Sequence, residues 1–178
     1  MKIIPTALDG VMIIEPRVFG DARGFFLETF QLERYRDALG IDHEFVQDNQ
    51  SRSGRGVLRG MHAQEMHPQG KLVRVAQGTI FDVAADINPQ SPTFGQWVGA
   101  ELSDTNHRQM WIPPGYAHGF VVLSDVADFI YKCTDYYHPD DEIGFLWNDP
   151  QVGIEWPVGE PLVSDRDAGL PNLAEIGA

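Results

Sequence analysis

Two short segments of the chain carry side chains that could perform proton chemistry. Residues 58–62 read Leu-Arg-Gly-Met-His, and residues 69–75 read Gln-Gly-Lys-Leu-Val-Arg-Val. An imidazole such as that of His62 titrates near neutral pH and can take a proton from a carbon beside a carbonyl. An ammonium such as that of Lys71 can stabilise the enolate oxygen that this step creates. Each residue alone is more often an ordinary strand residue at the surface, but together they indicate acid–base chemistry on a carbonyl compound.

Strand periodicity decides which of these residues can share a site. In a regular strand, His62 lies on the same face as Gly60, and Arg59 points the other way. Arg59 and His62 can therefore serve one site only if the strand contains a bulge, which a glycine at position 60 allows.

Lys71 and Tyr131 are both predicted to point into the interior. Lys71 alternates with Val73 on an apolar segment, and an inward-facing lysine needs an anionic partner. Tyr131 alternates with Phe129 and Cys133, so these three side chains share one face. The commoner role for such a tyrosine is a core aromatic with a satisfied hydroxyl. The alternative is a phenol that faces a cavity and returns a proton.

A second histidine follows a proline–glycine turn. Residues 113–118 have the form P-x-G-x-x-H, ending at His118, which is typical of the second motif of cupin barrels. The first cupin motif carries H-x-H with a nearby Glu as metal ligands, whereas His62 here is followed by Ala63 and Gln64. The cluster of imidazoles that a zinc or iron site needs is missing. The pattern therefore predicts a cupin barrel without a metal ion.

Three further features have competing interpretations. Arg23 lies near glycines that would let a phosphate approach closely, or it belongs to a charged surface turn. Tyr136 and Tyr137 lie on a turn and could stack on a base. Ser164 is a candidate helix cap, and Asp167 in isolation is most simply a charged first-turn residue of that helix.

Alternation of apolar and polar residues dominates the chain and predicts many short strands. The predicted strands cover residues 11–14, 72–76, 79–86, 96–102, 108–112, 119–123 and 128–133. The second and third of them, separated by Gln77 and Gly78, predict a hairpin with a two-residue turn. Many strands with little helix predict an all-β sandwich or jelly roll.

Helix signals are few. Residues 32–39 have a helical pattern, with Thr29 as a possible cap and Gly40 as the stop. The last twenty residues predict one more short helix. The fold class is therefore all-β with a few short peripheral helices.

The composition limits the class of protein. A chain of 178 residues with 43% hydrophobic residues is expected to form one domain over residues 1–178. A net charge of −13 argues against nucleic-acid binding, which needs a basic surface. The N-terminus resembles neither a signal peptide nor a membrane span, and no later segment is apolar enough to cross a bilayer. The single cysteine, Cys133, cannot form an internal disulfide, which favours a cytoplasmic location.

Taken in order, these segments resemble the dTDP-4-dehydrorhamnose 3,5-epimerase family. The matching segments are RGFFLETF (23–30), QDNQSRS (47–53), LRGMH (58–62), QGKLVRV (69–75), FDVAADI (81–87), SPTFGQWVG (91–99), RQMWIPPGYAHGF (108–120), YKCTDYY (131–137), WNDPQVGIEWP (147–157) and SDRDAGLP (164–171). They cover nearly the whole chain in one unbroken order, which is far more specific than any single motif.

The resemblance implies a metal-free cupin jelly roll that acts as a homodimer without a cofactor. Such an isomerase inverts C3 and C5 of dTDP-4-dehydro-6-deoxy-glucose to give dTDP-4-dehydro-L-rhamnose. By resemblance, His62 is the base and Asp167 holds its imidazole in the right tautomer. Tyr131 is the acid on the opposite face of the sugar, and Lys71 stabilises the enolate at the C4 oxygen.

The resemblance also implies a set of substrate-binding residues. Arg23 and Arg59 would bind the diphosphate, and Tyr137 would stack on thymine. The remaining implied ligand-binding residues are Glu28, Gln47, Asn49, His118, Glu142 and Arg166. At two positions the chain departs from the family pattern. Ala63 replaces an aromatic residue, which predicts a wider pocket wall, and Arg166 replaces a lysine, which keeps the charge but changes the geometry.

Three other functions compete with double epimerisation. A relative could invert only C3 or only C5, which position-resolved isotope exchange would reveal. A nucleotide-sugar-binding cupin without turnover would bind substrate without solvent exchange. A metal cupin would hold stoichiometric metal, but the missing H-x-H motif disfavours it.

Overall fold

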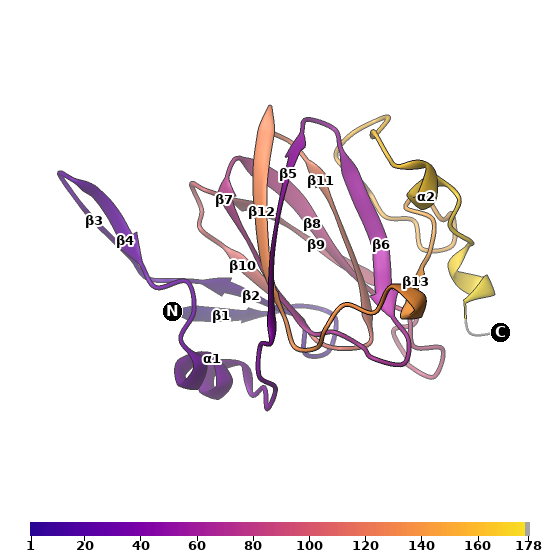
Figure 1. The fold of residues 1–178 in the computed structure, drawn as a ribbon, viewed down its shortest axis with the longest axis horizontal. Helices are drawn as coiled ribbons and strands as arrows, with labels where there is room; N and C mark the ends of the chain where they lie inside the picture. Colours follow the sequence, from indigo (N-terminus) through magenta and orange to yellow (C-terminus); the bar gives the residue numbers. More distant parts are fainter. Residues whose placement is uncertain (177–178) are drawn as a thin grey trace.

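The computed structural model describes residues 1–176, and two facing β-sheets form its body (Figure 1). The six-stranded sheet has the order β1-β2-β10-β7-β12-β5, and the five-stranded sheet has the order β13-β6-β11-β8-β9. Their strands are β1 (Lys2–Pro5), β2 (Met12–Glu15), β5 (Gln47–Gly54), β6 (Leu58–Gln64), β7 (Lys71–Gln77), β8 (Thr79–Asp86), β9 (Trp97–Ser103), β10 (Gln109–Ile112), β11 (Tyr116–Val122), β12 (Val126–Cys133) and β13 (Glu142–Gly144). This architecture confirms the predicted all-β jelly roll.

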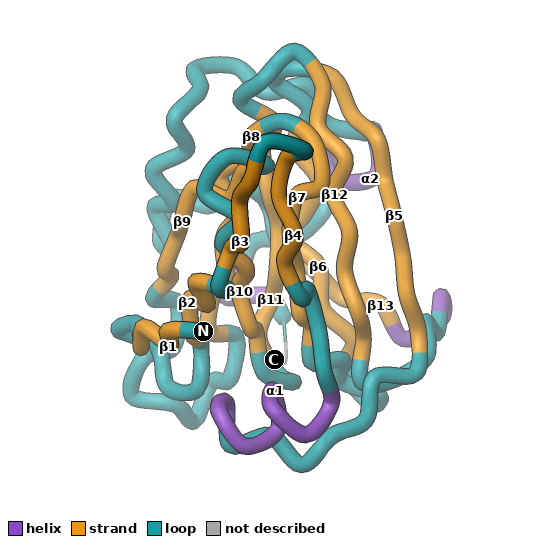
Figure 2. Tube along the Cα trace, turned by 90° about the vertical axis from the view of Figure 1, so that its left-hand side faces the viewer, coloured by secondary structure: helices purple, strands orange, loops and turns teal. Residues whose placement is uncertain are grey.

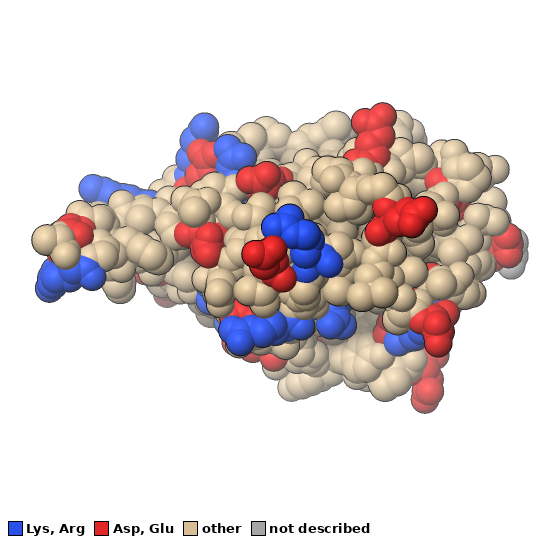
Figure 3. Space-filling model, turned by 90° about the horizontal axis from the view of Figure 1, so that it is seen from above, with Lys and Arg blue, Asp and Glu red and all other residues tan. Residues whose placement is uncertain are grey.

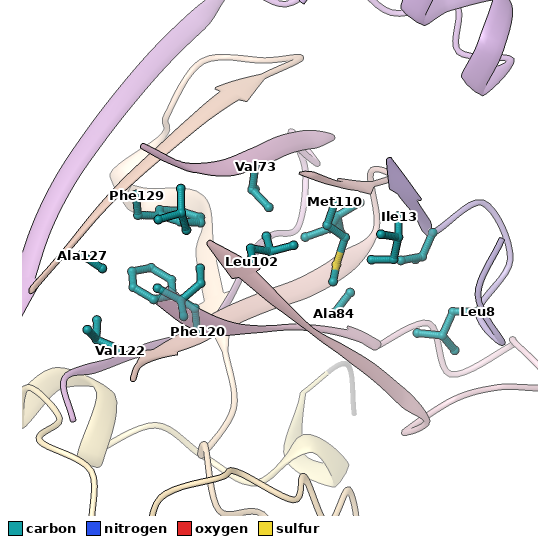
Figure 4. Close-up of a cluster of buried hydrophobic side chains, with 14 residues drawn as sticks. Leu8, Ile13, Val73, Ala84, Leu102, Met110, Phe120, Val122, Ala127 and Phe129 are labelled. Atoms are coloured by element: carbon teal, nitrogen blue, oxygen red, sulfur yellow. The ribbon is translucent and has the colours of Figure 1, made fainter. Parts of the chain in front are cut away.

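Apolar side chains from both sheets fill the space between them (Figure 4). Phe120 on β11 and Phe129 on β12 come from opposite sheets, and their rings stack with centroids 4.3 Å apart. Each fully buried side chain of this kind contributes about 1.5–3 kcal/mol to stability. Both phenylalanines also line a cavity between the sheets, so the core ends where that cavity begins.

The outer face of each sheet is covered at one end. Helix α1 (Leu32–Leu39) packs Tyr35 and Leu39 against Leu72 and Trp111 of the six-stranded sheet. The C-terminal segment contains α2 (Asp165–Ala168) and the 3₁₀ turn η2 (Leu173–Glu175). Another 3₁₀ turn, η1 (Pro139–Asp141), directly precedes β13. In Figures 1 and 2, α1 lies below the strands, and Figure 1 shows the C-terminal segment beyond the five-stranded sheet. None of the helices among residues 1–176 combines the length and the apolar character that a membrane crossing needs.

Helix α1 begins and ends for identifiable reasons. Its C-terminus is the predicted one, because Gly40 adopts the left-handed conformation with φ +65°. The N-cap, however, is Gln31, whose side chain accepts a hydrogen bond from the Arg34 amide at 2.6 Å. The prediction of Thr29 as the cap is wrong. The carbonyl of Thr29 instead accepts a hydrogen bond from the Tyr35 hydroxyl at 3.0 Å.

The predicted hairpin between β7 and β8 is also wrong. The two strands belong to different sheets, and the turn at Gln77 and Gly78 carries the chain from one sheet to the other. Gly78 has φ +82°, and a Cβ there would lie 2.1 Å from the Val126 carbonyl oxygen. A glycine turn suits a hairpin and a sheet-to-sheet crossing equally well. The choice depends on the distant strands with which β7 and β8 pair.

A separate hairpin projects from the body (Figures 1 and 2). It consists of β3 (Val18–Asp21) and β4 (Gly24–Leu27), which among residues 1–176 pair only with each other. Phe25 and Phe26 on this hairpin are 61% and 69% exposed. Seen from above, acidic and basic side chains are interspersed over the hairpin and the body (Figure 3). Two adjacent exposed phenylalanines are typical of a surface that another molecule covers.

Candidate active site

A cavity of about 590 Å³ opens between the two sheets. Strands β6 and β11 form one wall, β7 and β12 form the other, and the segment that leads into α2 borders it. Nine of the thirteen predicted site residues line this cavity: Arg59, His62, Lys71, His118, Tyr131, Tyr137, Glu142, Arg166 and Asp167. Its volume lies in the range of small-molecule sites.

His62 on β6 is held in place by Asp167 on α2. Its Nε2 lies 2.8 Å from Asp167 Oδ1, and Asp167 Oδ2 accepts a hydrogen bond from the Gly60 amide at 3.2 Å. Burial favours a higher pKa for Asp167, but the hydrogen bonds from His62, Gly60 and Ser164 outweigh it and lower that pKa overall. An ionised Asp167 keeps the proton of His62 on Nε2, which leaves Nδ1 as the basic ring nitrogen.

The short helix α2 aims Asp167 at His62. Ser164 is its N-cap, and the Ser164 hydroxyl accepts a hydrogen bond from the Asp167 amide at 3.1 Å. The predicted cap is therefore confirmed. Only 6% of the Asp167 side chain is exposed, compared with 29% for that of His62. The Asp167 carboxylate thus holds the imidazole from its buried side, at Nε2, and leaves the rest of the ring open to the cavity.

A bulge in β6 brings Arg59 and His62 to the same cavity. The register between β6 and β11 shifts between these two residues, and both line the cavity. Gly60 permits this with φ +126°, and a Cβ at this position would lie 2.6 Å from the Gly119 Cα. The bulge predicted at Gly60 is confirmed.

Lys71 and Tyr131 face His62 from the other sheet. They lie on the adjacent strands β7 and β12, whereas His62 lies on β6 of the opposite sheet. Burial raises the pKa of Tyr131, so its phenol is protonated at neutral pH and holds a proton that it can donate. Burial also lowers the pKa of Lys71, although the nearby acidic groups Cys133, Glu142 and Asp82 oppose this effect.

Glu142 connects the residues at one side of the cavity. Its Oε1 lies 2.6 Å from the Arg166 guanidinium, and its Oε2 accepts a hydrogen bond from the Tyr137 hydroxyl at 2.7 Å. The hydrogen bond to Glu142 raises the pKa of Tyr137. His62 Nε2 lies 3.9 Å from Glu142 Oε1. The arginine that replaces the expected lysine thus reaches the same carboxylate that borders His62.

The other four predicted site residues lie outside this cavity. Gln47 and Asn49 on β5 are its neighbours, because the Gln47 side chain accepts a hydrogen bond from the Tyr137 amide at 2.9 Å and donates one to Asn49. Arg23 lies on the projecting β3–β4 hairpin with 90% of its side chain exposed, and Glu28 just beyond it pairs with Arg34. Within one chain, the structure does not bring Arg23 and Glu28 to the cavity.

A second histidine–carboxylate pair lies beside the first. His118 on β11 is the register partner of His62, and its Nε2 lies 2.8 Å from Oδ1 of Asp82 on β8. The sequence interpretation missed Asp82. The sequence feature that could have revealed Asp82 is its position as an acidic residue inside the apolar run 80–85, where it faces the interior. Within residues 1–176, no three or more His, Cys, Asp or Glu side chains are grouped so that they could hold a metal ion.

Ala63 does not widen the pocket wall. Its side chain is buried in a different apolar cluster, with Met61 and Phe145, on the other side of β6 from the cavity. Neighbouring residues of a strand point to opposite faces, so the residue after His62 faces away from the site. The expectation that Ala63 loosens the cavity is wrong.

Comparisons with known proteins identify the family of this chain. A family model for dTDP-4-dehydrorhamnose 3,5-epimerase matches residues 5–175. The dTDP-4-dehydrorhamnose 3,5-epimerase of Shigella flexneri is 55% identical over 168 residues, which cover 94% of this chain and 93% of that protein. The chain belongs to the dTDP-4-dehydrorhamnose 3,5-epimerase family. It is therefore an epimerase, a type of isomerase.

Solved structures of the family have the same fold. The structure of the epimerase RmlC from Legionella pneumophila, in complex with dTDP-4-keto-L-rhamnose, is 57% identical to this chain with a TM-score of 0.96. The similarity covers 98% of this chain and 94% of that one. A family member that carries a single-site name, the dTDP-4-dehydrorhamnose 3-epimerase of Streptomyces niveus, is less similar, at 39% identity over 176 residues, which cover 98% of this chain and 85% of that protein.

Proposed function

We propose that this chain inverts both C3 and C5 of dTDP-4-dehydro-6-deoxy-D-glucose, giving dTDP-4-dehydro-L-rhamnose. The observation that carries the proposal is the placement of His62, oriented by Asp167, on one wall of the cavity and of Tyr131 and Lys71 on the other. Inversion at carbon requires a proton to leave one face and another to arrive at the opposite face. Groups on two facing sheets suit that requirement.

The proposed mechanism uses the same residues twice. The hydrogens at C3 and C5 lie on one face of the gluco-configured ring, and both are acidified by the C4 ketone. His62 removes the proton, and the electron pair of the C–H bond moves into the enolate at C4. Lys71 stabilises the enolate oxygen, and Tyr131 delivers its phenolic proton to the opposite face of the carbon.

Each inversion leaves the two proton-transfer groups in altered states. His62 then carries an extra proton, and Tyr131 is a phenolate. The imidazole is 29% exposed, so His62 can pass its proton to water at the open cavity. Burial raises the pKa of Tyr131, so its phenolate takes a proton back readily. The cycle closes with no net gain or loss of protons, and solvent hydrogen enters the product.

The binding roles extend the same proposal to the nucleotide. Arg59 supplies positive charge at the cavity for the diphosphate, which Arg23 is also proposed to bind, and Tyr137 offers a ring that is 46% exposed for stacking on thymine. Gln47 and Asn49 lie beside Tyr137 and could bind the edges of the base. His118 and Glu142 complete the set of binding residues on the cavity walls.

We further propose a homodimer in which the β3–β4 hairpin of each subunit reaches the cavity of its partner. This would bring Arg23 and Glu28 to a site that their own chain does not offer them, and it would cover the exposed Phe25 and Phe26. We also propose that residues 1–178 form a single domain, since both sheets draw strands from both halves of the chain. A cytoplasmic location is proposed as well, because the single cysteine, Cys133, does not require an oxidising compartment.

A purified heterodimer tests the hairpin exchange. One subunit carries Arg23→Ala and the other carries His62→Ala, so each homodimer lacks one function in both of its sites. If hairpins are exchanged, the heterodimer contains one intact site and one doubly impaired site, and its activity should be about half that of wild type. The rate of product formation by separately tagged, co-purified subunits measures this. A heterodimer as inactive as the two homodimers would contradict the exchange.

Product trapping tests the proposed function itself. The chain is incubated with dTDP-4-dehydro-6-deoxy-glucose and a reductase that acts on the L-lyxo product. We expect dTDP-L-rhamnose to accumulate, as resolved by chromatography and NMR. A reduced sugar inverted at only one centre would instead establish a single-site epimerase, and an unchanged substrate that still binds would establish a binding protein.

A further inference from the structure

Tyr137 lies on a segment that crosses from one sheet to the other. Residues 134–138 connect β12 of the six-stranded sheet to η1 and β13 beside the five-stranded sheet (Figure 1). Tyr137 lines the cavity, and 46% of its surface is exposed. Residues 134–138 themselves belong to no strand or helix, so no ladder of backbone hydrogen bonds fixes them. Side chains from other elements must therefore hold the ring of Tyr137 in place.

The buried side chain of Gln64 holds the backbone on both sides of this tyrosine. Gln64 is the last residue of β6 and is 5% exposed. Its Nε2 donates hydrogen bonds to the Tyr136 carbonyl at 3.2 Å and to the His67 carbonyl at 2.7 Å. Its Oε1 accepts a hydrogen bond from the His138 amide at 2.8 Å. The Gln64 amide thus pairs with the residues before and after Tyr137, as the backbone of a neighbouring strand would.

Two more side chains fix Tyr137 itself. Gln47 on β5 accepts a hydrogen bond from the Tyr137 amide at 2.9 Å, so amide side chains from both sheets meet at this position. Glu142 is the register partner of Gln64 and accepts a hydrogen bond from the Tyr137 hydroxyl at 2.7 Å. Two cross-strand neighbours therefore hold the tyrosine at its two ends, Gln64 at the backbone and Glu142 at the hydroxyl.

The same segment has contacts that do not involve Gln64. The ring of His67 stacks on that of His138, with centroids 4.1 Å apart at an angle of 22°. The Asp141 carboxylate accepts hydrogen bonds from the amides of Met66 and His67. These contacts would keep the segment attached if the Gln64 amide were removed. Loss of that amide should therefore shift the segment around Tyr137 without releasing it.

We infer that Gln64 is a positioning residue for Tyr137, holding its ring in the orientation that stacks on the base of a nucleoside diphosphate. This inference rests on the proposed binding role of Tyr137. Gln64 is not among the described residues that line the cavity, so it acts through Tyr137 and not by contact with the ligand. A ring that is already held in the stacking orientation loses less freedom on binding, which strengthens binding. Gln64 should thus affect binding of the nucleotide and not the proton transfers at the sugar.

Titration calorimetry with dTDP, on the purified full-length chain, tests this inference by a double-mutant cycle. Tyr137→Ala should raise the Kd of dTDP by about 5–150-fold, which is the usual loss for one base–aromatic stack. Gln64→Met keeps about the same side-chain length but makes none of the three hydrogen bonds of Gln64. It should raise the Kd by about 3-fold or more, but by less than Tyr137→Ala, because it displaces the ring and does not remove it. The double variant should bind dTDP no more weakly than Tyr137→Ala alone.

Two further measurements on Gln64→Met separate positioning from general damage to the site. With dTDP-4-dehydro-6-deoxy-glucose as substrate, KM should rise while kcat changes little, because the nucleotide is bound equally in the ground state and the transition state. Inorganic pyrophosphate has no base to stack on Tyr137. Its inhibition constant should therefore be the same for Gln64→Met and wild type.

Asp86→Leu is the matched control. Asp86 is the last residue of β8 in the same sheet and is 2% exposed, and its carboxylate holds a loop by accepting hydrogen bonds from Ser91 and Thr93. Asp86→Leu should lower the melting temperature, as Gln64→Met also should. It should leave the Kd of dTDP at the wild-type value, because the loop that Asp86 holds does not line the cavity.

Three results would overturn the inference while the proposed function stands. The first is a Gln64→Met variant that binds dTDP as tightly as Asp86→Leu. The second is a double variant in which the losses of the two single variants multiply, since that would give Gln64 a role independent of Tyr137. The third is an equal loss of dTDP and pyrophosphate binding. The wild-type protein is titrated and assayed first. If it neither binds dTDP nor turns over the substrate, the proposed function fails, and the role of Gln64 fails with it.

Discussion

We expect the His62→Ala variant to lose about 10²–10⁴-fold in the rate of epimerisation, which is the usual contribution of a positioned general base. The loss should appear at C3 and C5 alike, because a single imidazole serves both carbons in the proposed mechanism. Binding of dTDP should change little, since the nucleotide contacts come from other residues. Product formation by NMR and titration calorimetry with dTDP measure the two effects.

Two further variants, one at His62 and one at a control position, complete this experiment. His62→Asn keeps a side chain that can bond Asp167 but has no basic nitrogen, so it should be as inactive as His62→Ala. His43→Ala removes an exposed imidazole outside the cavity and should behave as wild type. Turnover in His62→Asn or His62→Ala at the rate of His43→Ala would show that His62 is not the base.

The Tyr131→Phe variant should separate proton removal from completed inversion. It keeps the ring that packs beside Phe129, with centroids 5.3 Å apart, and loses only the hydroxyl. His62 can still remove a proton and return a solvent deuteron to the same face. Deuterium should therefore enter the substrate with retained configuration, while inversion falls by about 10²-fold or more. NMR in D₂O distinguishes the labelled substrate from the product.

Tyr116→Phe is the matched control for this variant. The hydroxyl of Tyr116 donates a hydrogen bond to the Asp9 carbonyl at 2.9 Å and does not line the cavity. Its removal should leave both exchange and inversion unchanged. If Tyr131→Phe forms product as fast as Tyr116→Phe, the acid that completes inversion is another group.

Alternation along strands correctly predicted which way several site residues point. Lys71 and Tyr131 alternate with apolar neighbours, and both line the cavity as predicted. The bulge that brings Arg59 and His62 together was also predictable, because the two side chains can share a site only if the strand is bulged and Gly60 between them allows it. These inferences needed only local geometry, which the sequence encodes directly.

Interactions between distant segments were not predictable from local patterns. Asp167 lies 105 residues from His62, and on its own it looks like a first-turn residue of a helix. Only the resemblance to a family assigned it a role. Asp82 escaped notice because its partner His118 lies on a neighbouring strand rather than along the same segment. The wrong hairpin between β7 and β8 has the same cause, since strand pairing depends on distant partners.

The measurement that tests the central claim most directly is proton NMR of dTDP-4-dehydro-6-deoxy-glucose in D₂O with the wild-type protein. The account predicts that the C3 and C5 proton signals both disappear as solvent deuterium enters, and that both centres end inverted. Exchange and inversion at only one carbon would contradict double epimerisation. Loss of neither signal, while the sugar nucleotide still binds, would contradict catalysis at this cavity.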